Sequence, residues 1–277
     1  MMMSVVSPFT VRERLQPQSP AGVRLHRFTV DEYQRMAAYG VFQENDPVEL
    51  LSGYLFIKLE KGPPYEVPLG IPPEVIAGID VPQFPQRRFT VKEYQSLMKS
   101  GALHPALNTE LVEGWVVEKM VRDAVHDATL QVVIDALQER IGKEWKLRIQ
   151  SATQMDDGQP EPDLAVVPGP SRRFQDMHPR PIDIGLLVEI SNATVSYDRG
   201  PKMRDYARNN VTRYWLVNIN ERQVEEYTDP TGPTDCPEFK TRRIYREGDS
   251  ITLTVRNQTF GLVPVSELMP WNPSQAG

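Results

Sequence analysis

The sequence predicts an α/β fold, with a mixed β-sheet flanked by helices. Short apolar segments rich in β-branched residues alternate with segments of helical apolar spacing through residues 86–270, and this alternation is typical of mixed α/β domains. Hydrophobic residues make up 40% of the 277 residues, which is enough for a sizeable core in one large or two small domains. A third observation, an internal repeat, indicates how the chain is divided.

Residues 27–58 align without a gap with residues 88–119, and about a dozen of the 32 positions are identical. Each copy begins with a threonine, Thr29 or Thr90, that is predicted to cap a short helix because a glutamate follows three residues later. A hairpin is predicted next in both copies. Its strands flank the pair Ser52-Gly53 in the first copy and Glu113-Gly114 in the second, and such X-Gly pairs suit two-residue turns.

Three regions follow from the repeat. We expect residues 1–24 to form a flexible N-terminal arm, residues 25–85 to form an extra partial repeat and a proline-rich linker, and residues 86–277 to form the main domain. The prolines before residue 86 exclude long helices and central strands there. Two copies are too few for a solenoid. The first copy could extend a sheet edge, pair two protomers in a homodimer, or lie across the site, and we favour the first two.

The main domain is predicted to contain a series of elements after its hairpin. A long amphipathic helix should follow, because apolar residues recur at helical spacing. Strands, a basic helix and further strands come next. In order, these are a helix over 123–142, strands over 146–152, 163–167 and 184–191, a basic helix over 200–210, strands over 213–220 and 223–229, a last strand region over 242–255, and a short closing element over 263–270.

Charge and composition exclude several classes of protein. The net charge of −6 gives no global positive field towards nucleic acid or an anionic membrane, so a polyanion would have to be bound locally. The single cysteine, Cys236, can form neither an intrachain disulfide nor a cysteine metal site. No run of about 18 apolar residues is present. We therefore expect a soluble cytoplasmic protein in a reducing compartment, with no membrane partner.

Two carboxylates occur where the sequence predicts buried strands. Asp163 begins the strand in "PEPDLAVV", and Glu189 lies near the end of the apolar "IGLLVEIS". An unpaired ionised carboxylate in a protein interior costs several kcal/mol. A divalent cation such as Mg²⁺, which takes carboxylate and water oxygens, would stabilise both. Alternatively, Asp163 caps a turn and Glu189 forms a buried ion pair with Arg199 or Lys202.

The same segments resemble a known family. "PEPDLAVV" and the stretch from His178 through "VEISNATVSYDRGPKMRDYARNN" to "EEYTDP" look like the Uma-type putative restriction endonuclease family, a branch of the PD-(D/E)XK nuclease superfamily. The resemblance continues upstream through "FTVKEYQSLMKSGAL", "TELVEG" and His126, and downstream to "YREGDSITL" and "VSELMP". It thus covers nearly all of residues 86–270.

This resemblance implies a restriction-endonuclease-like core and Mg²⁺-dependent hydrolysis of phosphodiester bonds, with Mn²⁺ as a substitute metal. Asp163 and Glu189 match the acidic residues that hold the metal. The usual pattern has a lysine two residues after the glutamate, where this chain has Ser191, so the lysine is displaced to Lys202 of "YDRGPK". Glu110 of "TELVEG" matches an upstream acidic member of the site.

Other polar residues are candidates for supporting roles. His126 could polarise a water or bind phosphate, although a helix histidine more often only packs, and Gln150 could hold a catalytic water or equally hydrogen-bond a loop. Arg199, Arg204 and Arg208 lie in the basic segment "YDRGPKMRDYARNNVTR", which follows the strand that carries Glu189. They form the best local cluster of positive charge for binding a DNA backbone, although such charged segments are usually solvated helix faces.

The sequence is consistent with two main functions. The first is a metal-dependent endonuclease that hydrolyses DNA, as a homodimer in which two sites address two strands. The second is a catalytically inactive protein of the same fold that acts as a DNA-binding or protein-interaction module. A hydrolase of sugars or small phosphates that uses the paired carboxylates is a weaker third possibility, because no further substrate motif accompanies them.

Overall fold

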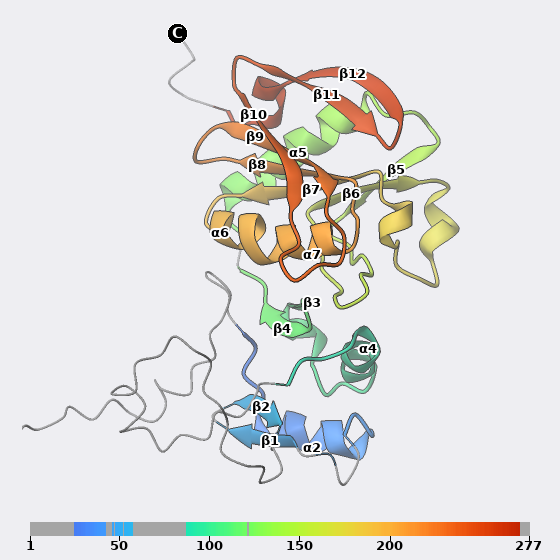
Figure 1. Ribbon diagram of the computed structural model, residues 1–277, viewed down its shortest axis with the longest axis vertical. Coiled ribbons are helices and arrows are strands. Elements are labelled where there is room, and N and C mark those ends of the chain that lie inside the picture. The colour runs from blue at the N-terminus through green and yellow to red at the C-terminus, as the bar shows by residue number, and fades with distance from the viewer. Residues whose placement is uncertain are drawn as a thin grey trace, which may run out of the picture. The chain divides into compact units, whose positions relative to one another are not determined.

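The structure is a computed structural model that describes residues 25–42, 46, 48–51, 53–57, 87–120 and 122–271 (Figure 1). The predicted N-terminal arm and nearly all of the proline-rich linker lie outside these residues. The chain divides into two compact units, one with His26–Arg88 and Gln95–Leu107 and the other with Phe89–Tyr94 and Asn108–Gly277. The domain boundary near residue 85 stays a prediction. None of the helices in the described ranges has the length and apolar character that crossing a membrane requires.

The first repeat copy contains a capped helix and a hairpin. Helix α2 (Val30–Ala38) begins at Thr29, whose hydroxyl accepts a hydrogen bond from the backbone N–H of Glu32 at 3.2 Å. The Glu32 carboxylate in turn accepts from the Thr29 N–H at 2.6 Å, which completes the predicted capping box. Strands β1 (Val48–Leu51) and β2 (Tyr54–Ile57) pair antiparallel.

The second copy has the same local structure. Helix α4 spans Val91–Lys99, and strands β3 (Thr109–Val112) and β4 (Trp115–Glu118) pair antiparallel. The turn residues Glu113 and Gly114 have φ values of 49° and 77°. Positive φ at both positions is the conformation that a two-residue hairpin turn requires.

Equivalent hydrogen bonds recur in the two copies. The Phe28 N–H donates to the Gly53 carbonyl at 2.8 Å, and the Phe89 N–H donates to the Gly114 carbonyl at the same distance. A tyrosine hydroxyl in each helix also donates to the first residue of the following hairpin. These pairs are Tyr33 with the Val48 carbonyl at 3.1 Å and Tyr94 with the Thr109 carbonyl at 3.0 Å.

The cap of α4 gives a first testable prediction. Thr90 accepts from the Glu93 N–H at 3.2 Å, so Thr90→Ala should lower the free energy of unfolding by about 1 kcal/mol, the usual cost of a lost N-cap. Thr90→Ser keeps the hydroxyl and is the matched control. Urea unfolding of both variants measures the difference, and equal stability of the two would contradict the capping role.

The main unit is built on a six-stranded mixed sheet in the order β10-β9-β8-β7-β6-β5. Only β7 and β8 run parallel, and the other neighbours are antiparallel. The strands are β5 (Trp145–Ile149), β6 (Leu164–Pro168), β7 (Leu186–Ser191), β8 (Arg213–Asn218), β9 (Gln223–Pro230) and β10 (Phe239–Arg246). The predicted mixed sheet flanked by helices is therefore confirmed.

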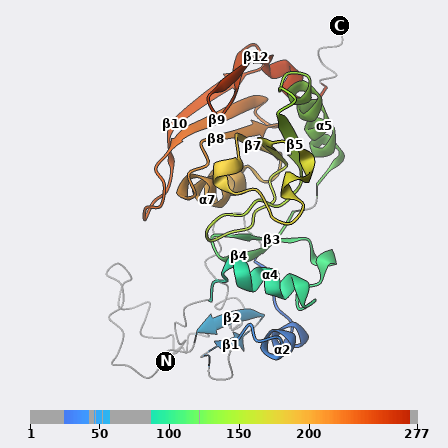
Figure 2. The ribbon, with the colours of Figure 1, turned by 90° about the vertical axis from the view of Figure 1, so that its right-hand side faces the viewer.

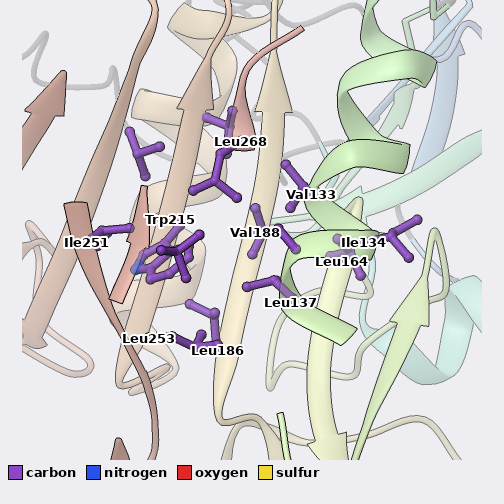
Figure 3. Packing of buried hydrophobic residues seen from close by; sticks show 14 of the residues in the cluster. Val133, Ile134, Leu137, Leu164, Leu186, Val188, Trp215, Ile251, Leu253 and Leu268 are labelled. Atoms are coloured by element: carbon purple, nitrogen blue, oxygen red, sulfur yellow. The ribbon is translucent and has the colours of Figure 1, made fainter. Parts of the chain in front are cut away.

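Helices cover both faces of this sheet (Figures 1 and 2). Helix α5 (Ala124–Gln138) packs Val133 and Leu137 against Val188 and Trp215 (Figure 3). Helix α7 (Met203–Arg208) lies on the opposite face. Successive strand residues point to opposite faces, so the strands β6, β7, β8 and β9 each contribute buried side chains to an apolar cluster on either face of the sheet. The short helical turns of this unit are α6 (Val195–Tyr197), η2 (Ser171–Phe174), η3 (Pro181–Asp183), η4 (Asp198–Lys202) and η5 (Val265–Leu268), while η1 (Pro105–Leu107) belongs to the other unit.

The C-terminal strands differ from the prediction. The predicted strand region over 242–255 is split between β10 and a separate two-stranded sheet of β11 (Ser250–Val255) and β12 (Gln258–Pro264). Strand β12 was not predicted. Most of its side chains are exposed, so it lacks the apolar alternation that marks a half-buried strand.

Candidate active site

A pocket of about 100 Å³ opens at the edge of the sheet where β7 ends and β6 begins. Six of the residues that the sequence singles out line it: Glu110, His126, Gln150, Asp163, Glu189 and Lys202. Glu110 lies on β3, Asp163 directly precedes β6, Glu189 lies on β7 and Lys202 belongs to the helical turn η4, and these four residues are buried. Folding thus brings together side chains that lie far apart in the sequence.

The antiparallel pairing of β6 and β7 places the two central carboxylates side by side. Leu164 lies opposite Val188 in the register, so Asp163 and Glu189 follow at the next positions. The Ile190 N–H donates to Asp163 Oδ2 at 2.9 Å, and the Asp163 N–H donates to Glu189 Oε2 at 3.3 Å. The backbone of each strand end therefore holds the carboxylate of the other.

Lys202 reaches this pair from a different element. Its Nζ donates to Glu189 Oε1 at 2.9 Å and lies 3.5 Å from Glu110 Oε1. The residue belongs to η4, a π-helical turn that contains Pro201, and such turns are frequent at functional sites. Ser191 occupies the position where the family usually has its lysine, and its neutral hydroxyl supplies no positive charge. The displacement of the lysine to Lys202 therefore still places an ammonium group against Glu189.

Glu110 has a donor for each carboxylate oxygen. The Tyr197 hydroxyl donates to Oε1 at 3.0 Å, and the Glu161 N–H donates to Oε2 at 2.8 Å. Glu110 thus contributes negative charge next to Lys202 while the hairpin and the loop before β6 hold its position.

His126 and Gln150 both face Asp163. His126 Nε2 lies 3.1 Å from Asp163 Oδ2, and Gln150 Nε2 lies 3.5 Å from Oδ1. Burial lowers the pKa of His126, but the hydrogen bond and charge of Asp163 outweigh it and raise the pKa above its ordinary value. Burial likewise opposes ionisation of Asp163, yet His126 and Lys202 lower the pKa of this carboxyl. His126 is therefore a partner of the aspartate within the site.

Two residues of the site were not predicted. Tyr206 donates its hydroxyl to Glu189 Oε1 at 2.6 Å. Its position four residues after Lys202 was the available signal, because residues at that spacing share a helix face. Asp198 also lines the pocket and accepts from the Thr194 hydroxyl at 2.6 Å.

The site carries an excess of buried negative charge. Four buried carboxylates, Glu110, Asp163, Glu189 and Asp198, surround the single ammonium group of Lys202. Burial raises the pKa of Glu189 to about 8 and that of Asp198 to about 6, although Lys202 opposes both shifts. The raised pKa values mean that these carboxyl groups lack enough positive charge nearby to ionise easily, and an all-oxygen donor set of this kind suits a hard divalent cation.

The geometry limits how much of a metal's coordination the protein could supply. Among the described residues, no group of three or more His, Cys, Asp or Glu side chains is arranged to hold a metal ion. Asp163 and Glu189 would thus be two carboxylate ligands, with water and substrate oxygens for the rest. Mg²⁺ is usually bound in this way, by one or two carboxylates together with waters and phosphate.

The three arginines that the sequence offers for DNA binding have protein partners. Arg199 Nε donates to Glu225 Oε1 at 2.9 Å, while Arg204 and Arg208 lie 3.0 and 3.4 Å from the Glu113 carboxylate. None of the three is among the residues that line the pocket in the described part of the chain. Their role towards nucleic acid stays a prediction.

The Arg199 pair makes a contribution to stability that depends on pH. Burial opposes ionisation of Glu225, but hydrogen bonds from Arg199 and Tyr227 hold the pKa of this carboxyl below its ordinary value. A lowered pKa means that the stabilisation is present at neutral pH and is lost as the pH falls below about 4. Arg199→Gln should therefore lower the free energy of unfolding by about 1–3 kcal/mol at neutral pH and by less at about pH 3. Urea unfolding at both pH values tests this, and a difference that is the same at both would contradict it.

Comparison with known proteins agrees with the resemblance seen in the sequence. The Uma2 family, described as "Putative restriction endonuclease", matches residues 91–262. No curated protein matches the chain. A crystal structure of a putative nuclease belonging to DUF820 from Anabaena variabilis aligns at 15% sequence identity with a TM-score of 0.48, over 65% of this chain and 97% of that chain. The family match extends over more than half of the sequence, and the chain therefore belongs to the Uma2 family of putative restriction endonucleases.

Proposed function

We propose that this chain is a divalent-metal-dependent endonuclease that hydrolyses phosphodiester bonds in DNA, with Mg²⁺ as the metal and Mn²⁺ as its substitute. One observation carries the proposal: Asp163, Glu189 and Lys202 gather at one pocket, where Lys202 Nζ lies 2.9 Å from Glu189. Two carboxylates and an ammonium group are the side chains that metal-assisted phosphoryl transfer needs. The family's description is consistent with this chemistry.

The two central carboxylates would hold the metal. A divalent ion bound by Asp163 and Glu189 would neutralise charge on the phosphate and lower the pKa of a water. His126 and the Ile190 N–H orient Asp163, since both contact its Oδ2 atom. Lys202 and Tyr206 both donate to Oε1 of Glu189 and fix the orientation of that carboxylate.

Lys202 would act as a cation rather than as a base. Burial lowers the pKa of an ammonium group, but Glu110, Glu189 and Asp198 more than offset this and raise the pKa of Lys202 well above its ordinary value. A lysine that stays protonated cannot accept a proton from water. It can donate hydrogen bonds to the attacking water or to the phosphate oxygens, where negative charge develops.

We propose DNA as the substrate, a homodimer as the assembly and the cytoplasm as the location. DNA is the proposed substrate because the family is described as restriction endonucleases. A homodimer would give two sites for two strands, and a cytoplasmic location would place the protein with DNA. Both are proposed together with the nuclease activity.

Cleavage assays test the proposed function. The intact protein should nick supercoiled plasmid in Mg²⁺ or Mn²⁺, and EDTA should stop the reaction. Single-stranded DNA, branched DNA and RNA in the same assay identify the substrate class. Binding to DNA without cleavage of any substrate would instead support an inactive module, and cleavage that continues in EDTA would exclude a metal-dependent mechanism.

A further inference from the structure

The lining of the pocket holds three lysine and arginine side chains, and they differ in what they contact. These are Lys119, Arg122 and Lys202. Lys202 is buried between Glu189 and Glu110. Lys119 forms an ion pair with Glu161. Two of the three positive charges therefore already have carboxylate partners.

Arg122 is different. Its side chain is exposed, and within the described residues it makes no hydrogen bond or ion pair. The following residue, Asp123, is held on both sides: its carboxylate accepts from the His126 N–H at 2.8 Å as the N-cap of α5, and from Asn192 Nδ2 at 2.8 Å. The guanidinium group of Arg122 thus faces solvent beside the pocket, and the hydrogen bonds of the neighbouring Asp123 hold the backbone at this point.

An unpartnered cation beside this acidic pocket would favour the binding of a phosphate substrate. The buried carboxylates around Lys202 repel a polyanion that approaches the pocket. A cation beside the entrance offsets this repulsion, and a guanidinium group can hold two phosphate oxygens at once through parallel hydrogen bonds. The arginines of η4 and α7 offer less, because Arg199, Arg204 and Arg208 are held by Glu225 and Glu113.

We propose that Arg122 binds a backbone phosphate of the DNA strand that enters the pocket, next to the phosphate that is cleaved. This inference rests on the proposed nuclease function and names the side chain that binds its substrate. Arg122 would contribute to binding of DNA of any sequence, because a phosphate contact carries no base information.

DNA binding and cleavage, measured separately, test the role of Arg122. Binding of a fluorescein-labelled duplex is followed by anisotropy in EDTA at several salt concentrations, and nicking of plasmid is followed in Mn²⁺. Arg122→Ala should weaken binding about tenfold and raise KM by a similar factor with little change in kcat. The slope of log Kd against log salt should fall by about one. Arg122→Lys should restore part of the affinity, since it keeps the charge.

Arg246→Ala is the matched control. It also removes one positive charge, but from an exposed residue of the edge strand β10 that does not line the pocket. Its DNA affinity should stay within about twofold of that of the unaltered protein. Equal binding by Arg122→Ala and the unaltered protein would overturn the inference, as would an equal loss in both variants. If the unaltered protein binds DNA but cleaves nothing, the proposed nuclease function fails while the binding role of Arg122 is still measured; if it binds no DNA, both fail.

Discussion

Lys202→Met should reduce the rate of metal-dependent cleavage by at least about 10²–10³-fold, which is the usual effect of removing one group that stabilises transition-state charge. The methionine side chain fills a similar volume but has no charge. The loss should appear in kcat, because Lys202, which is buried against Glu189 and Glu110, is proposed to donate to the attacking water or to the phosphate oxygens as charge develops. Single-turnover nicking of plasmid in Mn²⁺ measures it.

The same substitution should also affect stability, because it leaves buried carboxylates without their cation. Breaking a buried ion pair from one side costs about 3 kcal/mol or more. Circular dichroism establishes that the variant is folded at the assay temperature. Lys240→Met, on the exposed edge strand β10, is the control for the same chemical change. A folded Lys202→Met protein that cleaves within about threefold of the normal rate would exclude a role for the ammonium group.

Asp163→Asn should weaken Mn²⁺ binding more than about a hundredfold, since substitutions at residues that only support a metal ligand already cost 10–100-fold. Asparagine has nearly the same shape, and its amide oxygen can still accept from the Ile190 N–H. The negative charge and one ligand oxygen are lost. Isothermal titration calorimetry with Mn²⁺ measures the change.

Asp127→Asn provides a matched control for this titration. Asp127 lies 3.5 Å from the other ring nitrogen of His126, but its side chain is largely exposed and does not line the pocket. The control removes the same charge from the same helix region without touching Asp163. Its Mn²⁺ affinity should change less than about threefold. Unchanged binding in Asp163→Asn would contradict the assignment of Asp163 as a ligand.

Much of the fold could be predicted because the signals are local. Short, nearly continuous apolar runs predicted the central strands β6 and β7, and the turn pair Glu113-Gly114 predicted the hairpin of β3 and β4. Strand β12 escaped prediction because its side chains are mostly exposed. The basic helix over 200–210 begins earlier than predicted, with a π-helical turn at η4, which no local propensity indicates.

The candidate site was predictable only in part. Asp163 and Glu189 were visible because carboxylates are unexpected in buried strands, and Lys202 was found through the family resemblance. The glutamates that pair with Arg199, Arg204 and Arg208 could not be predicted from the sequence. Arg204 and Glu113, for example, are 91 residues apart in the sequence, and no local pattern indicates such a pair. The availability of Arg122 likewise depends on which carboxylates lie near it in three dimensions.

The most direct test of the account is plasmid nicking by the unaltered protein and by Asp163→Ala, each in Mn²⁺ and in EDTA. We expect the unaltered protein to nick the plasmid in Mn²⁺ but not in EDTA, and the folded Asp163→Ala variant to nick it under neither condition. Nicking by Asp163→Ala at the normal rate would contradict it, because the reaction would then proceed without the carboxylate on which the proposed metal site is built. Absence of nicking by the folded unaltered protein on any DNA would equally contradict it and would favour an inactive binding module.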